Sequence, residues 1–323
     1  MKVYAAYRGR FVAGWMLDDF FGRRVLPILQ GKYQDWGDAR TLGRRLLKTD
    51  ILPDVGYRVA GVWHDESWQE IPLSRVGSAL FREDDALFFK SEFSNQELGV
   101  TYVHRDNFDP MDAKLSGNLV VQRRIRPHAF FDQFGSGRMA TLRITTIKPA
   151  GRPTQYAAAY IRFGSNIDGT GEVGAISQIR ASVINDDGEL EEGAALANWH
   201  KVRSHPASGE TFAGKVIPEF RAAVKTCVQL HERFPHVGVV GWDVGINDRN
   251  QIELMEWNTA HPDIKFSEAT EGPCFSEFGW ESLGQNQKSG RAVILRKPSG
   301  NAGFAIAGAD WDALGFRRGR RHS

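Results

Sequence analysis

The chain has 323 residues, 41% of them hydrophobic and 25% charged, and its 41 Lys and Arg residues nearly balance 39 Asp and Glu residues. This composition is typical of a packed globular protein and excludes collagen-like, coiled-coil and largely disordered chains. The longest apolar stretches have the length of a strand, whereas a helix that spans a membrane needs about 20 apolar residues, so we expect no membrane partner.

The first part of the chain, up to about residue 54, combines helix signals with charge. Arg8, Arg10, Asp18 and Asp19 interrupt any signal-peptide core, so we expect a cytoplasmic protein. Apolar residues between positions 11 and 28 suggest helix, and basic residues follow between positions 40 and 48. We treat residues 1–75 as an N-terminal segment that precedes the main fold.

From residue 55 onward, short runs typical of β-strands dominate the sequence. Apolar residues at spacings of three and four predict one helix over residues 215–233. Its regular part should begin near Pro218, because proline is tolerated only in the first turn. Strands mixed with helix predict an α+β fold. The predicted strands are residues 56–63, 86–90, 119–124, 141–147, 156–163, 174–179, 238–246 and 251–258.

The cysteines and the C-terminal tail carry little chemistry. Cys227 and Cys274 are too few for a disulfide framework or a Cys-rich zinc site, so we expect both to be inert core thiols. The tail from Arg317 to Ser323 is strongly basic, which fits either a nucleic-acid role or a solvated terminus. Elsewhere acidic and basic residues are interspersed, so we expect no nucleic-acid partner.

The most informative stretch is residues 239–263, where acidic side chains lie within strand-like runs. Two such runs flank the polar tetrapeptide 247–250, which suits a hairpin turn. With a loop of two or four residues, Asp243 opposes Leu254, and Ile252, Glu256 and Asn258 share that face. A loop of three or five residues would move Asp243 to the opposite face.

The side chains of Asp243, Glu256 and Asn258 supply oxygen ligands. A diagonal of roughly 7 Å lets two carboxylates converge on metal ions that lie about 3.5–4 Å apart. Ligation by oxygen alone suits Mg²⁺ with bound phosphates and does not suit zinc. The alternative is that Asp243 is an edge-strand charge and Glu256 faces solvent, although carboxylates within apolar strands are costly unless they are paired or bind a metal.

Two of these runs resemble motifs of the ATP-grasp family. Glu256-Trp257-Asn258 resembles the E-x-N metal motif of ATP-grasp ligases, and the run 241–243 resembles the strand that carries their other metal-binding acid. The resemblance implies an ATP-grasp fold, in which two α+β lobes grip ATP beside an additional N-terminal segment. It also implies two Mg²⁺ or Mn²⁺ ions: Asp243 binds one ion, Glu256 bridges both, and Asn258 holds the second. Thr259-Ala260-His261 displace the proline that usually follows the Asn.

Candidates for the nucleotide side of such a site lie in the preceding strands. Lys90 ends an apolar strand, where a point charge can meet phosphate oxygens, and a lysine that only extends into water is the alternative. The run 119–125 resembles the hinge between ATP-grasp lobes, which implies that Gln122 meets the adenine amino group and Ile125 offers its backbone. His128 is a candidate for the ribose, with a surface histidine as the alternative.

The loop after Lys90 departs from the family pattern. Residues 91–100 keep the closing Gly99-Val100 but lack the usual run of glycines. Cradling of phosphates by consecutive backbone amides depends on glycine flexibility. The glycine-poor loop 91–98 therefore supports one alternative to an active ATP-grasp enzyme, which is a nucleotide-binding or scaffold protein with weak catalysis.

Two strands each carry a single arginine among apolar neighbours, Arg143 and Arg162. Guanidinium groups clamp carboxylate or phosphoryl oxygens bidentately, so we assign both to the substrate carboxylate and an acyl phosphate. A buried structural ion pair is the alternative for either arginine. These motifs follow one another between about residues 80 and 265 and include the glycine-rich run 169–174. Their order most resembles that in the sugar-transfer-associated branch of ATP-grasp proteins.

The resemblance implies an ATP-dependent carboxylate–amine ligase that forms an amide through an acyl phosphate and releases ADP and phosphate. Its partners are a small-molecule carboxylate and amine, such as a sugar acid or an amino acid, and we allow for a homodimer. Residues 76–126 are assigned to a small lobe and hinge, 127–290 to a large lobe, and 291–323 to a C-terminal extension. A small-molecule kinase is the main alternative, because ATP-grasp-like sites also phosphorylate hydroxyl groups.

Overall fold

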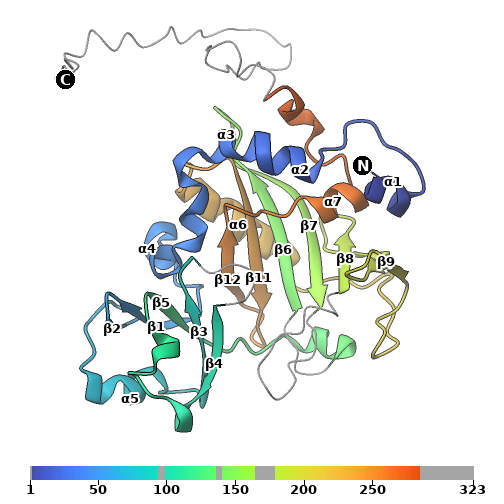
Figure 1. The fold of residues 1–323 in the computed structure, drawn as a ribbon. Coiled ribbons are helices and arrows are strands. Elements are labelled where there is room, and N and C mark those ends of the chain that lie inside the picture. The colour runs from blue at the N-terminus through green and yellow to red at the C-terminus, as the bar shows by residue number, and fades with distance from the viewer. Residues whose placement is uncertain (1, 94–98, 136–139, 164–178, 284–323) are drawn as a thin grey trace, which may run out of the picture. The chain divides into compact units, whose positions relative to one another are not determined.

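The computed structural model describes residues 2–93, 99–135, 140–163 and 179–283, and its strands form two antiparallel sheets (Figure 1). Most of the strands predicted from the sequence are present, with slightly shifted ends. Four predicted features lie wholly or partly outside the described residues. These are residues 94–98 of the loop after Lys90, the glycine-rich run 169–174, the run 174–179 apart from Ile179, and the C-terminal extension 291–323 with its basic tail.

The smaller sheet has the strand order β2-β1-β5-β3-β4. The run 56–63, predicted as one strand, forms two strands because Ala60 and Gly61 have positive φ angles and turn the chain back. Both strands belong to this sheet, so the boundary predicted at residue 76 falls inside it. The strands are β1 (Asp54–Val59), β2 (Val62–Asp65), β3 (Ala86–Ser91), β4 (Val100–His104) and β5 (Leu119–Arg123).

One face of the smaller sheet packs against helix α5 (Val76–Leu80). Apolar residues at alternate positions, such as Leu87 and Phe89, are buried in this contact. Because side chains alternate between the two faces of a strand, Lys90 and Gln122 lie on the opposite face. The alternation in the sequence thus separates the core of this sheet from its polar face.

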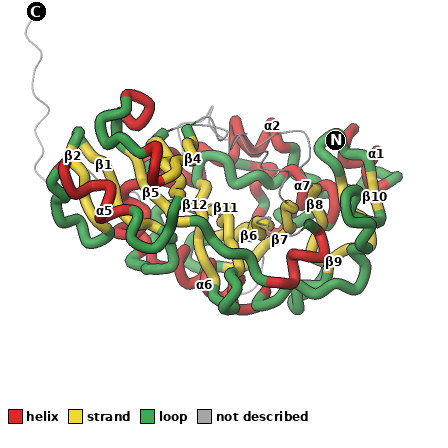
Figure 2. The backbone as a smooth tube through the Cα atoms, turned by 90° about the horizontal axis from the view of Figure 1, so that it is seen from below, coloured by secondary structure: helices red, strands yellow, loops and turns green. Residues whose placement is uncertain are grey.

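The larger sheet has the order β10-β9-β8-β7-β6-β11-β12, which Figure 2 shows from below. Strand β11 lies between β6 and β12, so Asp243 is an interior residue of the sheet and not an edge-strand charge. Strands β4, β9 and β10 were not predicted. The strands are β6 (Ala140–Ile147), β7 (Gln155–Phe163), β8 (Ile179–Val183), β9 (Leu190–Ala195), β10 (Lys201–Val202), β11 (Val239–Ile246) and β12 (Ile252–Asn258).

Helix α6 (Phe220–Arg233) covers one face of the larger sheet (Figures 1 and 2). The helix begins at Phe220, shortly after Pro218 as predicted, and Glu219 before it takes a left-handed conformation. Its buried stripe includes Cys227, a free thiol, as predicted, whereas the free thiol of Cys274 is only partly buried. Burial raises the pKa of both thiols, which keeps them protonated and unreactive.

The opposite face of the larger sheet is bordered by α7 (Lys265–Thr270) and the N-terminal segment (Figure 2). The helix predicted between positions 11 and 28 is broken, and only α2 (Asp18–Phe20), a π-helical turn and the start of α3 (Leu26–Gln30) fall within it. Helices α1 (Lys2–Arg8) and α4 (Gly43–Leu47) lie outside that range. The buried Gln30 amide donates to the carbonyls of Val239 (2.7 Å) and Thr259 (2.8 Å). The N-terminal segment is therefore fastened to β11 and to the residue after β12.

Short helical turns join these elements. A π-helical turn covers Phe21–Val25. The 3₁₀ turns are Gly31–Asp38, Arg40–Leu42, Leu73–Arg75, Arg105–Asn107, Ala113–Leu115, Ala129–Phe134, Ser276–Phe278 and Trp280–Ser282. Over the described ranges, no helix has both the length and the apolar character that a membrane crossing requires.

Candidate active site

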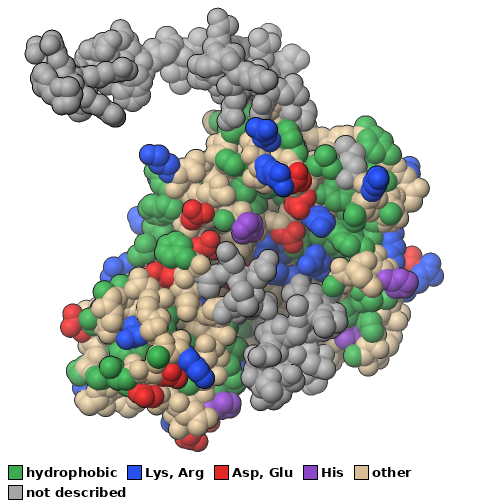
Figure 3. All heavy atoms as spheres, viewed as in Figure 1, with side chains coloured by type: hydrophobic (Ala, Val, Ile, Leu, Met, Phe, Trp, Pro, Cys, Tyr) green, Lys and Arg blue, Asp and Glu red, His purple; other side chains and the backbone are tan. Residues whose placement is uncertain are grey.

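The site is built on a row of side chains that crosses the larger sheet. Glu256 pairs with Asp243, Asp243 with Arg143, Arg143 with Tyr160, and Tyr160 with Ser182. Residues directly opposite one another in a sheet point to the same face. The row thus contains three of the predicted site residues, Arg143, Asp243 and Glu256. Figure 3 shows acidic and basic side chains gathered on this face, over β6 and β7.

The hairpin β11–β12 reaches this arrangement by a different register from the predicted one. Asp243 opposes Glu256 and not Leu254, which pairs with Val244 and lies on the core face. The loop holds three residues between Asn247 and Gln251, whose backbones are hydrogen-bonded. That loop alone would place Glu256 on the wrong face.

A β-bulge corrects the register. Val244 pairs with Leu254 and Asp243 pairs with Glu256, so Met255 is the extra residue. One additional residue reverses the alternation of side chains beyond it. Glu256 and Asn258 therefore return to the face of Asp243, while Leu254 stays in the core.

Asp243 accepts hydrogen bonds from three side chains. Arg143 donates from Nε to Oδ1 (2.7 Å) and from Nη2 to Oδ2 (2.8 Å), Arg162 donates to Oδ1 (2.5 Å), and Asn258 donates to Oδ2 (3.2 Å). Burial acts to raise the pKa of Asp243, but the two guanidinium charges outweigh it and hold the pKa well below its usual range. The carboxylate is therefore ionised at any physiological pH.

Arg143 forms the buried ion pair that the sequence left open as an alternative. Its Nη1 also donates to the carbonyl oxygens of Pro262 (3.1 Å) and His261 (3.4 Å). A Cβ atom on Gly241 would lie 2.7 Å from the Pro262 carbonyl oxygen and 3.0 Å from Arg143 Nη1. Only glycine lets this turn cross the strand so closely. Arg143 thereby fixes both Asp243 and the turn that follows the E-x-N strand.

Glu256 faces positive charge from the smaller sheet and the N-terminal segment. The closest cation is Arg40, whose Nη2 lies 3.8 Å from Glu256 Oε2 and which also donates to the Ser91 carbonyl (2.6 Å). Burial and then the charge of Asp243 raise the pKa of Glu256, whereas Lys90 and Arg40 act to lower it. Burial lowers the pKa of Lys90, against the charge of Glu256. Arg40 could not be predicted as a site residue, because no local motif in the sequence marks it.

The predicted hinge residue Gln122 is held by a buried carboxylate. Gln122 donates from Nε2 to Asp54 Oδ1 (2.8 Å), and the Tyr57 hydroxyl donates to Asp54 Oδ2 (3.0 Å). This contact orients the Gln122 amide so that its oxygen is left as an acceptor. Ile125 follows β5 and, within the described residues, its backbone makes no backbone hydrogen bond. His128 instead caps the next turn, because its Nδ1 accepts from the Phe130 amide (2.9 Å).

A second polar contact ties the hinge to the hairpin. Arg123 Nη2 lies 2.7 Å from Glu253 Oε2, and Asn247 donates from Nδ2 to Glu253 Oε1 (2.7 Å). Glu253 is nearly completely buried, so its charge needs both partners. The hinge after β5 is therefore connected to the loop end of the hairpin that carries Asp243 and Glu256.

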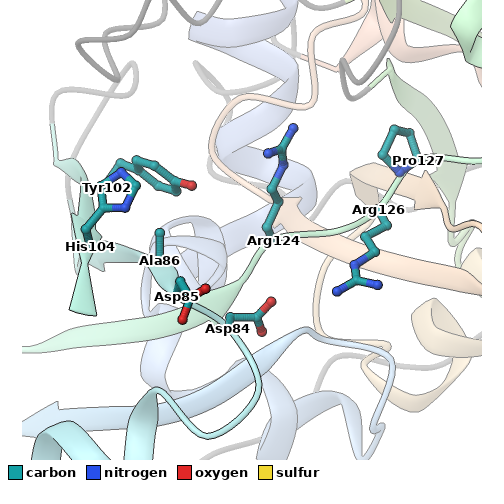
Figure 4. Close-up of a pocket in the computed structure, with 8 residues that line it drawn as sticks. All are labelled: Asp84, Asp85, Ala86, Tyr102, His104, Arg124, Arg126 and Pro127. Atoms are coloured by element: carbon teal, nitrogen blue, oxygen red, sulfur yellow. The ribbon is translucent and has the colours of Figure 1, made fainter. Parts of the chain in front are cut away.

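A pocket of about 310 Å³ lies beside the hinge (Figure 4). It is lined by the start of β3, the end of β4 and the hinge, and Figure 4 shows the side chains of Arg124 and Arg126 leaving the hinge in opposite directions. Tyr102 and His104 line it from β4, on the face of the smaller sheet that carries Lys90. The pocket therefore opens on the polar face of this sheet.

The side chains around Glu256 have the chemistry that an oxygen-ligated cation needs. The described residues contain no cluster of three or more His, Cys, Asp or Glu side chains arranged for a metal ion. The row instead offers two directly opposed carboxylates, Asp243 and Glu256, with the amide of Asn258 beside them. This set suits Mg²⁺ or Mn²⁺, which accept carboxylate and amide oxygens.

Comparison with known proteins gives a family match. A model of the family described as sugar-transfer associated ATP-grasp matches residues 107–277, more than half of the chain. This range contains every predicted site residue except Lys90. Among curated proteins, no sequence matches the chain.

Several solved structures resemble the chain at low sequence identity. The D-alanyl-alanine synthetase A of Vibrio cholerae has a TM-score of 0.45 and 16% identity, over 80% of this chain and 66% of that one. The D-alanine-D-alanine ligase of Coxiella burnetii gives 0.41 and 10%, over 80% and 61%. An N5-carboxyaminoimidazole ribonucleotide synthetase, solved with ADP, gives 0.41 and 9%, over 68% and 44%. The chain thus spans 44% to 66% of these structures.

Proposed function

The chain belongs to the sugar-transfer associated ATP-grasp family, and from this premise we propose that it is an ATP-dependent ligase that joins a carboxylate to an amine. The observation that carries the proposal is the pairing of Glu256 with Asp243 on one sheet face, with Lys90 of the other sheet close enough for their charges to interact. Two carboxylates that can bind a cation, with a lysine nearby, suit the binding of a nucleoside triphosphate together with its metal ion.

The smaller sheet and the hinge supply the proposed nucleotide contacts. Lys90 pairs with phosphate oxygens, the Gln122 oxygen accepts from the adenine amino group, and the backbone of Ile125 completes the recognition of adenine. The pocket beside the hinge is lined by Arg124 and Arg126, the two neighbours of Ile125 in the chain, and is large enough for part of a nucleotide. The proposed small lobe begins at Asp54, because β1 and β2 pair within its sheet, and the large lobe spans residues 127–290.

Asp243, Glu256 and Asn258 are the proposed metal ligands. Mg²⁺ or Mn²⁺ bound there would neutralise charge on the phosphates. The chain's own residues position the reactants: Lys90 holds the nucleotide, and Arg162 and Arg143 supply positive charge on the opposite side of Asp243.

The proposed reaction has two steps. An oxygen of the substrate carboxylate attacks the γ-phosphorus of ATP, the bond to the β-phosphate oxygen breaks, and ADP leaves. The amine then attacks the carbonyl carbon of the acyl phosphate, loses a proton, and releases phosphate as the amide forms. Small acids such as sugar acids or amino acids are the proposed carboxylate substrates.

The test is a screen of paired acids and amines in which ADP, AMP and free phosphate are all measured. A ligase releases phosphate only when both substrates are present. Glu256→Gln should abolish this metal-dependent turnover, whereas Asp248→Asn, an exposed acid at the tip of the same hairpin, should leave it unchanged. Phosphate that stays on a hydroxyl product, or normal turnover in folded Glu256→Gln, would contradict the proposal.

A further inference from the structure

Hydrogen bonds from described residues occupy the acceptor positions of the Asp243 carboxylate. A carboxylate offers about four lone-pair positions on its two oxygens. Oδ1 accepts from Arg143 Nε and Arg162 Nη2, and Oδ2 accepts from Arg143 Nη2 and Asn258 Nδ2. A metal ion needs one of these positions. One of the four donors must therefore leave before Asp243 ligates a metal.

The donors differ in how firmly they are held. The Arg143 side chain is 5% exposed and makes two hydrogen bonds to Asp243 and two more to backbone carbonyls. The Arg162 side chain is 21% exposed and contacts Asp243 through Nη2 alone. Exchange of Arg162 breaks one hydrogen bond to Asp243, whereas exchange of Arg143 breaks a buried bidentate pair.

We infer that Arg162 is an exchangeable partner of Asp243, which holds the carboxylate in the metal-free site and is displaced when a divalent cation binds. The inference rests on the proposed function, because it concerns the proposed metal ligand. Arg162 and the cation compete for Oδ1, and Arg143 keeps Asp243 in place throughout. Arg162 is thus a positioning residue, which contacts Asp243 when the metal is absent and leaves it when the metal binds.

The next strand supplies a matched control for Arg162. Arg162 pairs directly with Arg180 of β8, so the two side chains share the site face.

The first test measures Mn²⁺ affinity by electron paramagnetic resonance on the full chain. Arg162→Met should bind Mn²⁺ roughly 10- to 100-fold more tightly than wild type, because the competing charge-assisted hydrogen bond is gone. The matched control is Arg180→Met, which removes the same charge from the same face and should tighten binding by about threefold or less. Equal effects of the two substitutions, or weaker binding in Arg162→Met, would overturn the inference.

The second test uses the wild-type protein and does not depend on how the variants fold. Phenylglyoxal modifies accessible arginines, and peptide mass spectrometry measures the rate at each one. Saturating Mn²⁺ should accelerate modification of Arg162 severalfold and leave Arg143 slow. An unchanged rate at Arg162 would refute its displacement.

The failure of this inference is separable from failure of the proposed function. Binding of a fluorescent ATP analogue is measured on the same samples. If Mn²⁺ binds and Arg162 does not respond, the exchange is refuted while the metal site and the ligase proposal stand. If neither Mn²⁺ nor the ATP analogue binds to any variant, the proposed function itself is refuted, and the exchange with it.

Discussion

Replacement of Arg143 by methionine should destabilise the protein much more than the same replacement of Arg162. Methionine keeps an unbranched chain of similar length but removes all four hydrogen bonds that Arg143 makes to Asp243, His261 and Pro262. Asp243, 2% exposed, then keeps its charge with Arg162 as the remaining cation that is hydrogen-bonded to it among the described residues.

The expected magnitude follows from this loss. Breaking a buried ion pair by removing one partner costs about 3–5 kcal/mol, and the remaining contact to Arg162 favours the lower end of that range. For a domain of this size, 1 kcal/mol lowers the melting midpoint by about 2–4 °C. We therefore expect Arg143→Met to melt roughly 6–12 °C below wild type. Arg162→Met, which loses one charge-assisted hydrogen bond at a partly exposed site, should lose only about 3–5 °C.

The assay is calorimetric melting at neutral pH, with urea unfolding as an independent measure of the free energy of unfolding. Because the arginine charges lower the pKa of Asp243, their stabilisation is complete above about pH 4 and is lost as the pH falls below it. The difference between Arg143→Met and wild type should therefore shrink in acid. A midpoint within 2 °C of wild type, or a larger loss in Arg162→Met, would refute this assignment.

Three further predictions test other parts of the site and the core. Gly241→Ala places a Cβ atom 2.7 Å from the Pro262 carbonyl oxygen, so it should lower both turnover and the melting midpoint, and melting with a turnover assay checks this. Asp54→Ala removes the acceptor that orients Gln122, so the Kd for ATP, measured by calorimetry, should rise about tenfold while Mn²⁺ binding is unchanged. Burial lowers the pKa of His231 to about 4. Between pH 7 and pH 5 the unfolded chain therefore takes up a proton that the folded protein does not, so the free energy of unfolding should fall by about 2 kcal/mol. Urea unfolding should show a flatter pH dependence for His231→Gln than for wild type.

Local patterns in the sequence were sufficient to locate most strands and the main helix. Alternation of side chains is a property of a single strand, and the spacing of three and four is a property of a single helix, so neither requires knowledge of the partner element. The failures lie where a turn decides the outcome. Ala60 and Gly61 split one predicted strand. The edge strands β4 and β10, and β9 beside β10, were not predicted.

The candidate site could be predicted as a set of residues but not as an arrangement. The spacing within Glu256-Trp257-Asn258 places both polar side chains on one face by local geometry alone, and the family match covers this motif. The partner of Glu256 was predicted in the wrong register, because the loop length and the bulge at Met255 each shift it by one residue. The two shifts add in the register, so Asp243 opposes Glu256 in place of Leu254, but their effects on the side-chain face cancel, which the sequence does not reveal.

The sequence by itself determined which side chains are available: the acids, the amide, the lysine and the two arginines on strands. The tertiary structure alone decided how they are used, with Arg143 committed to Asp243, Arg40 brought to Glu256, and Asp54 placed behind Gln122. The physical reason is that periodicity fixes the face of one strand, whereas each of these contacts joins residues far apart in the chain. Such partners are selected by packing of the whole fold and by the cost of leaving a buried charge unpaired.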